Sequence, residues 1–312
     1  MQDSPRHPVA VTRSRLAADL RRLGVRAGGI TMVHARMSAI GWVVGASETV
    51  VRALLDALGP EGTLMAYASW EDHVYRAAEW PQEHRDAYLA APPVFDVATA
   101  EAVREHGRIP ERVRTWPGAE RSSHPEAGVV AVGARTKWLT EAHPQQDAYG
   151  SDSPFARLID AAGQVLLLGA PLETTTLLHH AEAIARVPHK RRVTFRVPVA
   201  ERDRAVTRTF TDIDTSGGPF PYEELGLDED EFAVIARAAL AAGIGVRGHV
   251  GQAESHLVPA PELTAFAVSW IEARFGWTME LSPRHADAAS ACRAAPGSRP
   301  RRPPPPSGSG RR

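Results

Sequence analysis

The stretch 164–190, QVLLLGAPLETTTLLHHAEAIARVPHK, constrains the fold of this chain more than any other. It opens with an apolar run, residues 165–168, with Gly163 and Gly169 near its two ends. A short apolar run bounded by glycines is typical of a strand that is buried on both faces. The three threonines at 174–176 then precede a helical segment, and we expect their hydroxyls to cap it. The stretch therefore predicts a buried strand, a turn and a helix, as in an α/β fold.

A histidine and a glutamate lie on the same face of this predicted helix. His179 and Glu182 are three residues apart, a spacing at which helical side chains meet. A carboxylate fixes the tautomer of a neighbouring imidazole and stabilises its cation, so the pair is suited to act as a general base. An ordinary surface pair is the alternative for such a spacing. The position just past a buried strand favours a functional site, because α/β folds place their sites there.

The opening of the chain predicts a parallel strand–helix–strand unit. Apolar residues 30–34 and 63–67 are typical of strands, and residues 46–58 carry apolar side chains at the helical spacing. Residues 35–45 are expected to form a loop, and 68–117 a long polar and aromatic excursion of functional importance. The remaining expected elements are helices at 11–23, 137–141, 154–161, 228–242 and 261–275, a strand at 129–132, a hairpin at 193–197 and 206–210, and an extended segment at 246–258.

Composition predicts one globular domain over residues 1–280 and a disordered tail over 281–312. The tail is rich in Ala, Arg, Pro and Ser, and from Pro296 onward it holds five arginines and no acid. Because the whole chain carries a net charge of −1, the remainder carries −6. A mildly acidic body argues against a nucleic-acid partner and suits a cationic small molecule.

Several classes of protein are disfavoured by what the sequence lacks. Its single cysteine, Cys292, excludes an intramolecular disulfide and a cysteine-based zinc cluster. No apolar stretch approaches the roughly 20 residues of a membrane span, and the first residues lack a signal pattern, so we expect a cytoplasmic protein without a membrane partner. The GIGVRG run at 243–248 has no strand before it, so it does not indicate a dinucleotide site. Neighbouring His179 and His180 point about 100° apart on a helix, so no metal is expected there.

Two groups of polar residues stand out in the predicted loops. One combines acids and aromatic rings, and is expected to form an acidic cleft that concentrates a polycation. Its members are Trp70, Glu71, Asp72, Tyr75, Asp212 and Asp214. The other consists of hydrogen-bond donors suited to phosphates or a polar carrier arm, with ordinary surface donors as the alternative. Its members are His34, Arg36, Arg121, Ser122 and His124.

A series of spaced motifs resembles one known family. In chain order these are MVHARMSAIG, TLMAYASWED, FDVATA, GRIPERVRTWPGAERSSHP, SPFARL, VLLLGAPLETTTLLHHAEA and DIDTSGG, spread over roughly residues 12 to 277. The order and spacing resemble the aminoglycoside 3-N-acetyltransferases. The resemblance implies an α/β fold peculiar to that family, with a central mixed sheet flanked by helices, distinct from the common small N-acetyltransferases. It also implies acetyl-CoA as the donor substrate and a 2-deoxystreptamine antibiotic as the acceptor, giving antibiotic resistance.

The resemblance also implies roles for particular residues. His179 would be the general base and Glu182 its partner, while His34, Ala35, Arg36 and Ser38 would lie along the pantetheine arm of the donor. Arg121, Ser122 and His124 match a motif similar to a donor-site element. Apart from the resemblance, the place of Glu71, Asp72, Asp212 and Asp214 in the predicted acidic cleft leads us to expect that they dock the other ammonium groups of the acceptor. Trp70 and Tyr75 would form the aromatic walls of that cleft.

Two departures from the family pattern bear on specificity, and two alternative functions remain. Position 180 is His where relatives often have Tyr, and position 71 is Glu where they often have Asp. Either departure would alter which antibiotics fit. The alternatives are an acetyltransferase for another amine, and a metallohydrolase or amine-binding protein that uses the His–Glu helix.

Overall fold

The computed structural model describes residues 9–72, 77 and 79–276. The chain divides into two units, Met1–Gly276 and Trp277–Arg312. The predicted tail, with Cys292, lies outside the described residues, as does Tyr75. In the described part of the first unit, no helix is long and apolar enough to cross a membrane.

The first unit is built on a seven-stranded mixed sheet in the order β3-β4-β2-β1-β5-β9-β8. Its centre is formed by three parallel strands: β2 (Thr63–Tyr67), β1 (Ile30–Ala35) and β5 (Gln164–Leu168). All five residues of β5 are buried, as the sequence predicts. Helix α3 (Ala46–Leu58) connects β1 to β2, so the predicted parallel unit is confirmed.

Antiparallel strands complete the sheet on both sides. On one side, β4 (Val129–Gly133) pairs with β2 and then with the short β3 (Glu120–Arg121). On the other, the segment predicted as extended forms a hairpin of β8 (Val246–Val250) and β9 (Ala253–Pro259), and β9 pairs with β5. The mixed α/β architecture expected from the sequence is therefore present.

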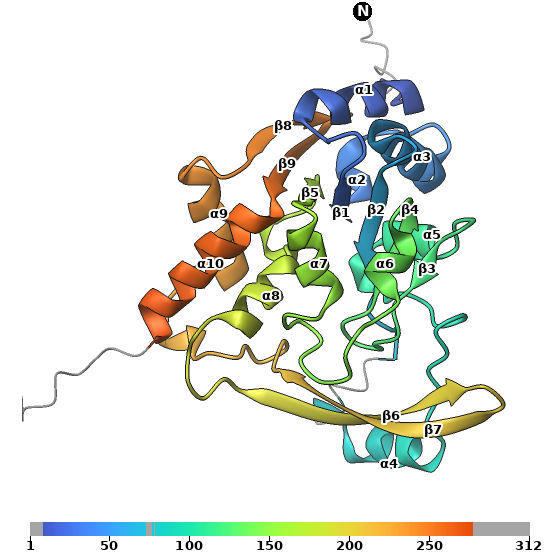
Figure 1. Cartoon of the computed structure of the whole chain (residues 1–312), viewed down its shortest axis with the longest axis vertical. Helices are drawn as coiled ribbons and strands as arrows, with labels where there is room; N and C mark the ends of the chain where they lie inside the picture. The colour runs from blue at the N-terminus through green and yellow to red at the C-terminus, as the bar shows by residue number, and fades with distance from the viewer. Residues whose placement is uncertain (1–8, 73–76, 78, 277–312) are drawn as a thin grey trace, which may run out of the picture. The chain divides into compact units, whose positions relative to one another are not determined.

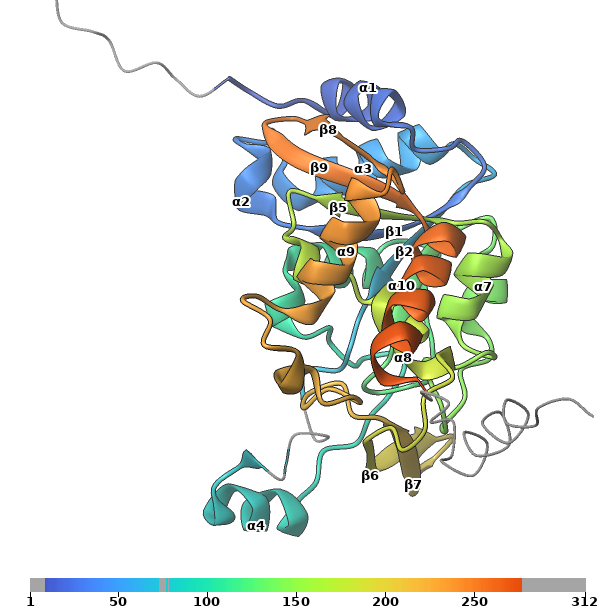
Figure 2. The same cartoon turned by 90° about the vertical axis from the view of Figure 1, so that its left-hand side faces the viewer.

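Helices cover both faces of the sheet and create two hydrophobic cores (Figures 1 and 2). Successive side chains of a strand point to opposite faces of the sheet, so neighbours such as Met32 and Val33 enter different cores. One core is closed by α1 (Arg13–Leu23), α3 and α5 (Arg108–Arg114). The other is closed by α6 (Thr136–Thr140), α7 (Pro154–Asp160), α8 (Leu177–Ile184), α9 (Glu231–Ala241) and α10 (Ala260–Phe275).

A long two-stranded hairpin lies apart from the main sheet. Strands β6 (Arg192–Glu201) and β7 (Arg204–Ile213) confirm the predicted hairpin and extend it at both ends. Its inner face packs against Phe95 in a small separate core. Tyr88 of helix α4 (Gln82–Ala90) packs against this small core, and Figure 2 shows the helix set to one side of the hairpin.

The structure corrects three local expectations. Residues 35–45 contain a short helix, α2 (Met37–Ile40), and the excursion 68–117 contains α4, α5 and the 3₁₀ turn η2 (Arg104–His106). The threonines before α8 do not cap it. The Thr174 hydroxyl donates to the carbonyl oxygen of Pro171, and the Thr175 hydroxyl donates to that of Leu172, at the start of the 3₁₀ turn η3 (Leu172–Thr174). These hydroxyls fold the turn that delivers α8, which is an alternative use of the same side-chain chemistry.

Candidate active site

A cavity of about 810 Å³ lies where the three parallel strands end. Residues 33–38 line it from the end of β1, and Tyr67 lines it from the end of β2. The turn after β5 contributes Ala170, Pro171, Glu173, Thr174 and Thr176. His179 of α8 completes this wall. Carboxyl ends of parallel strands meet at one edge of a sheet, so the topology itself gathers these segments.

Glycine at position 169 makes the turn after β5 possible. Its φ of +63° lies in the left-handed region, which favours glycine. A Cβ at this position would lie 2.7 Å from Cβ of Ala39 and 2.9 Å from Cβ of Ala253. The turn therefore packs tightly between α2 and β9, and directs the chain into the cavity wall.

The predicted pair of His179 and Glu182 is in hydrogen-bond contact. Nδ1 of His179 lies 2.8 Å from Oε2 of Glu182, whose side chain is buried. The other carboxylate oxygen, Oε1, accepts a 2.8 Å hydrogen bond from the Tyr222 hydroxyl. Both oxygens of Glu182 are thus engaged, and the imidazole is held with Nδ1 directed at the carboxylate.

The environment of His179 raises its pKa above the ordinary 6.5. Burial by itself lowers this pKa. The hydrogen bond and the negative charge of Glu182, together with the charges of Glu126 and Asp212, raise the pKa by more than burial lowers it. The ring is also enclosed by aromatic side chains, with ring centroids of Tyr149 at 5.1 Å and Phe232 at 4.6 Å. These contacts restrict its rotation and shield it from bulk water.

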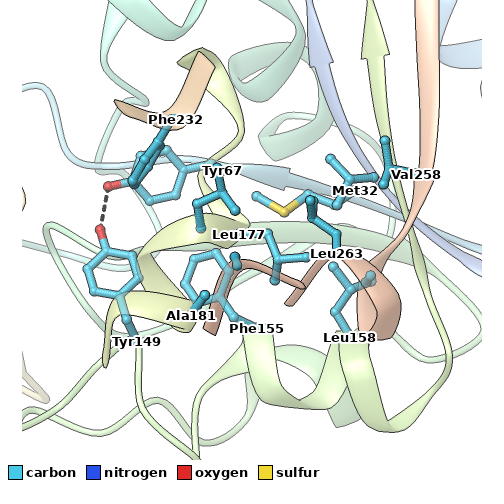
Figure 3. Packing of buried hydrophobic residues seen from close by; sticks show 14 of the residues in the cluster. Met32, Tyr67, Tyr149, Phe155, Leu158, Leu177, Ala181, Phe232, Val258 and Leu263 are labelled. Atoms are coloured by element: carbon cyan, nitrogen blue, oxygen red, sulfur yellow. Dashed lines mark hydrogen bonds between the residues drawn. The ribbon is translucent and has the colours of Figure 1, made fainter. Parts of the chain in front are cut away.

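A buried carboxylate, Glu126, lies on the cavity wall with His179. It accepts hydrogen bonds from the hydroxyls of Tyr149 at 3.0 Å, Tyr67 at 3.3 Å and Thr215 at 3.3 Å. The two tyrosine hydroxyls also contact each other at 2.9 Å (Figure 3). Burial raises the pKa of Glu126, while His179 and the three hydroxyls lower it.

Asp212 lies behind this wall and does not line the cavity. It is buried, and its carboxylate accepts hydrogen bonds from the backbone amides of Ala148 and Ile213. Burial, followed by the negative charge of Glu126, raises its pKa to about 7. Its contact with Ala148 holds the loop that carries Tyr149, so Asp212 affects the cavity only indirectly.

The residues predicted along the donor arm fall into two sets. His34, Ala35, Arg36 and Ser38 all line the cavity, and burial lowers the pKa of His34 to about 3, so its imidazole is neutral. The other set, Arg121, Ser122 and His124, is buried and does not line the cavity.

These three buried residues instead hold the loop that carries Glu126. Arg121 donates to the carbonyl oxygens of Ala68 and Pro125. The Ser122 hydroxyl accepts from the amide of Val129, and Nδ1 of His124 accepts from the amide of Ala127 at 2.8 Å. These contacts are with the protein backbone, and the predicted contact of the three side chains with the donor stays a prediction.

The acids predicted for acceptor binding do not line the cavity. Glu71 pairs with Arg104 at 3.5 Å, Asp72 accepts a hydrogen bond from Tyr88, and Asp214 accepts from the amides of Ser216 and Gly217. Trp70 packs on Phe95 in the hairpin core. The cavity is acidic nevertheless, through the other carboxylates Glu79, Glu105, Glu126 and Glu173.

Sequence reasoning did not find Glu126 or Tyr222. Glu126 follows His124 by two residues in the run RSSHPE, so it lies directly beside the recognised motif, and the structure shows that it is the residue of this run that lines the cavity. Tyr222 lies forty positions after Glu182, and no local pattern links the two. His180 faces away from the cavity, with Nδ1 2.6 Å from the carbonyl oxygen of Tyr149, so neither it nor Glu71 contacts the cavity directly.

The described residues contain no group of three His, Cys, Asp or Glu side chains that could hold a metal ion. Glu182 forms hydrogen bonds with both His179 and Tyr222. The arrangement is that of an oriented base beside an acidic cavity, with the neutral His34 and the cationic Arg36 along one wall.

Comparison with known proteins gives a consistent result. The aminoglycoside 3-N-acetyltransferase family model matches residues 32–272. Aminoglycoside N(3)-acetyltransferase VIII of Streptomyces fradiae is 52% identical over 268 residues, covering 85% of this chain and 93% of the relative. Aminoglycoside N(3)-acetyltransferase VII of Streptomyces paromomycinus is 48% identical, with the same coverage.

Solved structures share the fold as well as the sequence. The aminoglycoside acetyltransferase AAC(3)-Xa superposes with a TM-score of 0.81 at 47% identity, covering 85% of this chain and 94% of that one. AAC-IIIb, solved with CoASH, has a TM-score of 0.79 at 43% identity, covering 86% and 98%. AAC-VIa, solved with sisomicin, has a TM-score of 0.79 at 36% identity, covering 86% and 100%. The motifs, the strand order and these similarities together show that the chain belongs to the aminoglycoside 3-N-acetyltransferase family.

Proposed function

We propose that this protein transfers the acetyl group of acetyl-CoA to the 3-amino group of a 2-deoxystreptamine antibiotic. The observation that carries the proposal is the His179–Glu182 pair, 2.8 Å apart, on the wall of an acidic cavity at the edge of the sheet. The family relationship supplies the reaction class. The antibiotic sisomicin and CoASH, which are bound in structures of relatives, indicate the classes of acceptor and donor.

His179 acts as the general base. An ammonium nitrogen cannot attack a thioester, so the acceptor amine must lose a proton as it attacks the acetyl carbonyl. With Nδ1 donating to Glu182, the lone pair of Nε2 is available to take that proton. The negative charge of Glu182 then stabilises the imidazolium. Transfer is direct, from thioester to amine, with CoA leaving as the thiol.

The donor occupies the wall formed by the end of β1. His34, Ala35, Arg36 and Ser38 supply backbone and side-chain polar groups along the path of the pantetheine arm. Arg121, Ser122 and His124 are proposed to support the reaction by fixing the loop of Glu126, since they contact the protein backbone and not the cavity.

The acceptor is held by carboxylates of the cavity. Glu126 is buried beside His179, and an ammonium group placed there would gain a hydrogen-bonded ion pair in a low-dielectric setting. The exposed acids Glu79 and Glu105 extend the negative charge outward. Such a gradient attracts a polycation and orients it before reaction.

A thiol-release assay with acetyl-CoA and a panel of aminoglycosides tests the proposal. We expect CoA release with 2-deoxystreptamine antibiotics, and NMR of the product should place the acetyl group on nitrogen 3. His179→Ala should lower turnover by about 10²–10⁴-fold, the contribution of a positioned base, while CoA still binds. Transfer only to amines other than aminoglycosides, or full turnover by His179→Ala, would contradict the assignment. Expression in susceptible bacteria should raise the inhibitory concentration of the accepted antibiotics.

A further inference from the structure

Two buried histidines outside the cavity bind consecutive backbone carbonyls of one loop. His143 and His180 are both buried, and neither lines the cavity that holds His179. Nε2 of His143 lies 2.9 Å from the carbonyl oxygen of Ala148, and Nδ1 of His180 lies 2.6 Å from that of Tyr149. A carbonyl oxygen only accepts hydrogen bonds, so each imidazole carries its proton on the nitrogen that faces the loop.

The second nitrogen of His143 connects this loop to the segment before Glu126. Burial lowers the pKa of His143 to about 3, so the ring is neutral at neutral pH and Nδ1 has a lone pair. Nδ1 lies 2.8 Å from the Ser122 hydroxyl, which accepts a hydrogen bond from the amide of Val129. The hydroxyl therefore donates to Nδ1. His143 thus joins the segment that leads to Glu126 to the loop that carries Tyr149.

His180 connects the same loop to the helix that carries the base. It follows His179 on α8, and neighbouring side chains of a helix point about 100° apart. His179 therefore faces the cavity while His180 faces the loop. Asp212, at the end of β7, adds a third contact by accepting a 2.8 Å hydrogen bond from the amide of Ala148. Side chains from three parts of the chain thus hold the backbone at 148–149.

The residue held in this way, Tyr149, contacts both groups on which the proposed reaction depends. Its hydroxyl donates to the Glu126 carboxylate and lies 2.9 Å from that of Tyr67 (Figure 3). Its ring centroid lies 5.1 Å from that of His179, and the ring stacks on Phe155. The side chain is fully buried in a close-packed core, so a shift of its backbone moves the hydroxyl and the ring together.

The hydroxyl of Tyr149 helps to keep the Glu126 carboxylate charged. Burial raises the pKa of Glu126, and the hydrogen bond from Tyr149 is among the contacts that lower it. A carboxylate that loses this donor takes up a proton more readily. It then binds an ammonium group more weakly, because the ion pair is lost. CoA carries no ammonium group, so its binding does not depend on this charge.

We propose that His143 and His180 are positioning residues for the acceptor. Through the two carbonyls, they fix the hydroxyl of Tyr149 on Glu126 and so set the affinity for an aminoglycoside. Neither histidine touches a substrate. The inference rests on the proposed function, in which Glu126 binds an ammonium group of the antibiotic.

Side-chain amides of two lengths test the inference in a crossed design. The amide of glutamine replaces Nε2 of a histidine, and the shorter asparagine replaces Nδ1. His143→Gln and His180→Asn therefore keep the donor to the loop, whereas His143→Asn and His180→Gln lose it. Each position receives both amides, so the loss of the imidazole ring is matched within each pair.

Calorimetry with sisomicin and with CoA measures the effect. We expect the Kd of sisomicin to rise about fivefold in His143→Asn and His180→Gln, as when a buried hydrogen bond is lost. The two variants that keep the donor should bind sisomicin nearly as the wild type does. The Kd of CoA should stay unchanged in all four variants. Either position gives the test by itself, so one variant that fails to fold does not remove it.

Each other pattern overturns the inference. An equal Kd of sisomicin for the two amides at each position would mean that the carbonyl contacts do not act on the acceptor. A parallel loss of CoA affinity would make the histidines general supports of the fold. The sisomicin titrations contain no acetyl-CoA, so a crossed pattern in a protein that transfers no acetyl group would reject the proposed function and leave the positioning role standing. A wild type that binds no aminoglycoside would reject both.

Discussion

The hydroxyl of Tyr222 donates a 2.8 Å hydrogen bond to Oε1 of Glu182, from a 3₁₀ turn forty residues later in the chain. The other oxygen of Glu182 binds His179, so one buried carboxylate joins the base to a separate element. A carboxylate with both oxygens occupied has little freedom to rotate. We therefore expect Tyr222 to act on the proposed reaction through the orientation of His179.

Tyr222→Phe should lower kcat by roughly tenfold or more, with little change in the KM of either substrate. A hydrogen bond to a charged group contributes about 1.5–3 kcal/mol, and its loss frees the carboxylate to turn. Steady-state kinetics with an accepted aminoglycoside measures this. Tyr88→Phe, which removes a hydroxyl bound to Asp72 outside the cavity, is the matched control and should keep its kcat. Equal losses in both variants would mean that Tyr222 is only structural.

The pH dependence of kcat should follow the ionisation of His179. The free base is the active form, and the pKa of His179 is raised above 6.5, so kcat should rise with pH through a midpoint above 6.5. In Glu182→Gln the raising charge is gone and burial remains, so the midpoint should move to lower pH while the maximal kcat falls. Rate profiles at saturating substrates measure both. A midpoint that does not move in Glu182→Gln would show that the rise of kcat with pH reflects the ionisation of a group other than His179.

Glu126→Gln should weaken acceptor binding and leave the donor unaffected. Removing the charge from a buried ion pair costs about 2–5 kcal/mol, which corresponds to a Kd at least about 30-fold higher for the antibiotic. Calorimetry with the antibiotic and with CoA measures the two separately. Glu105→Gln, an exposed acid of the same cavity, should change antibiotic binding much less, because exposed pairs contribute about 1 kcal/mol or less. Equal binding by wild type and Glu126→Gln would remove this carboxylate from the acceptor site.

Local sequence patterns predicted most of the sheet and part of the cavity wall. Strands β1, β2 and β5 follow from short apolar runs, and the His179–Glu182 contact follows from helical spacing. Contacts between distant segments have no such local signature, so Tyr222 was not predicted. Glu71 and Asp72 were predicted for the cleft from their position after a strand, and they instead bind Arg104 and Tyr88 nearby.

Asp212 should make stability depend on pH between 3.8 and about 7. Its pKa is 3.8 when unfolded and about 7 in the fold, so over this range the native state holds a proton that the unfolded chain releases. Its stabilising contribution is complete below the lower value and is lost as pH rises through the upper one. Since one pKa unit corresponds to about 1.4 kcal/mol, the loss amounts to a few kcal/mol.

Comparison with Asp212→Asn isolates this effect from that of the histidines. Urea unfolding at several pH values between 4 and 8 gives the free energy of unfolding of each protein. We expect the wild type to lose stability relative to the variant as pH rises. A constant difference across the range would show that Asp212 titrates alike in the folded and unfolded states.

Gly169→Ala should reduce both stability and activity. A left-handed φ costs a non-glycine residue about 1–2 kcal/mol, and the added methyl must displace Ala39 and Ala253 at a cost of roughly 1–3 kcal/mol more. The displacement falls on α2 and β9 beside the cavity wall, so kcat/KM should fall as well. Gly118→Ala is the matched control: its φ is +78° and no atom lies within 4 Å of the new Cβ. It should lose only the backbone contribution to stability and keep its kcat/KM. Thermal unfolding and kinetics of the two variants separate strain from displacement, and a Gly169→Ala enzyme with unaltered kcat/KM would show that the cavity tolerates a shift of this turn.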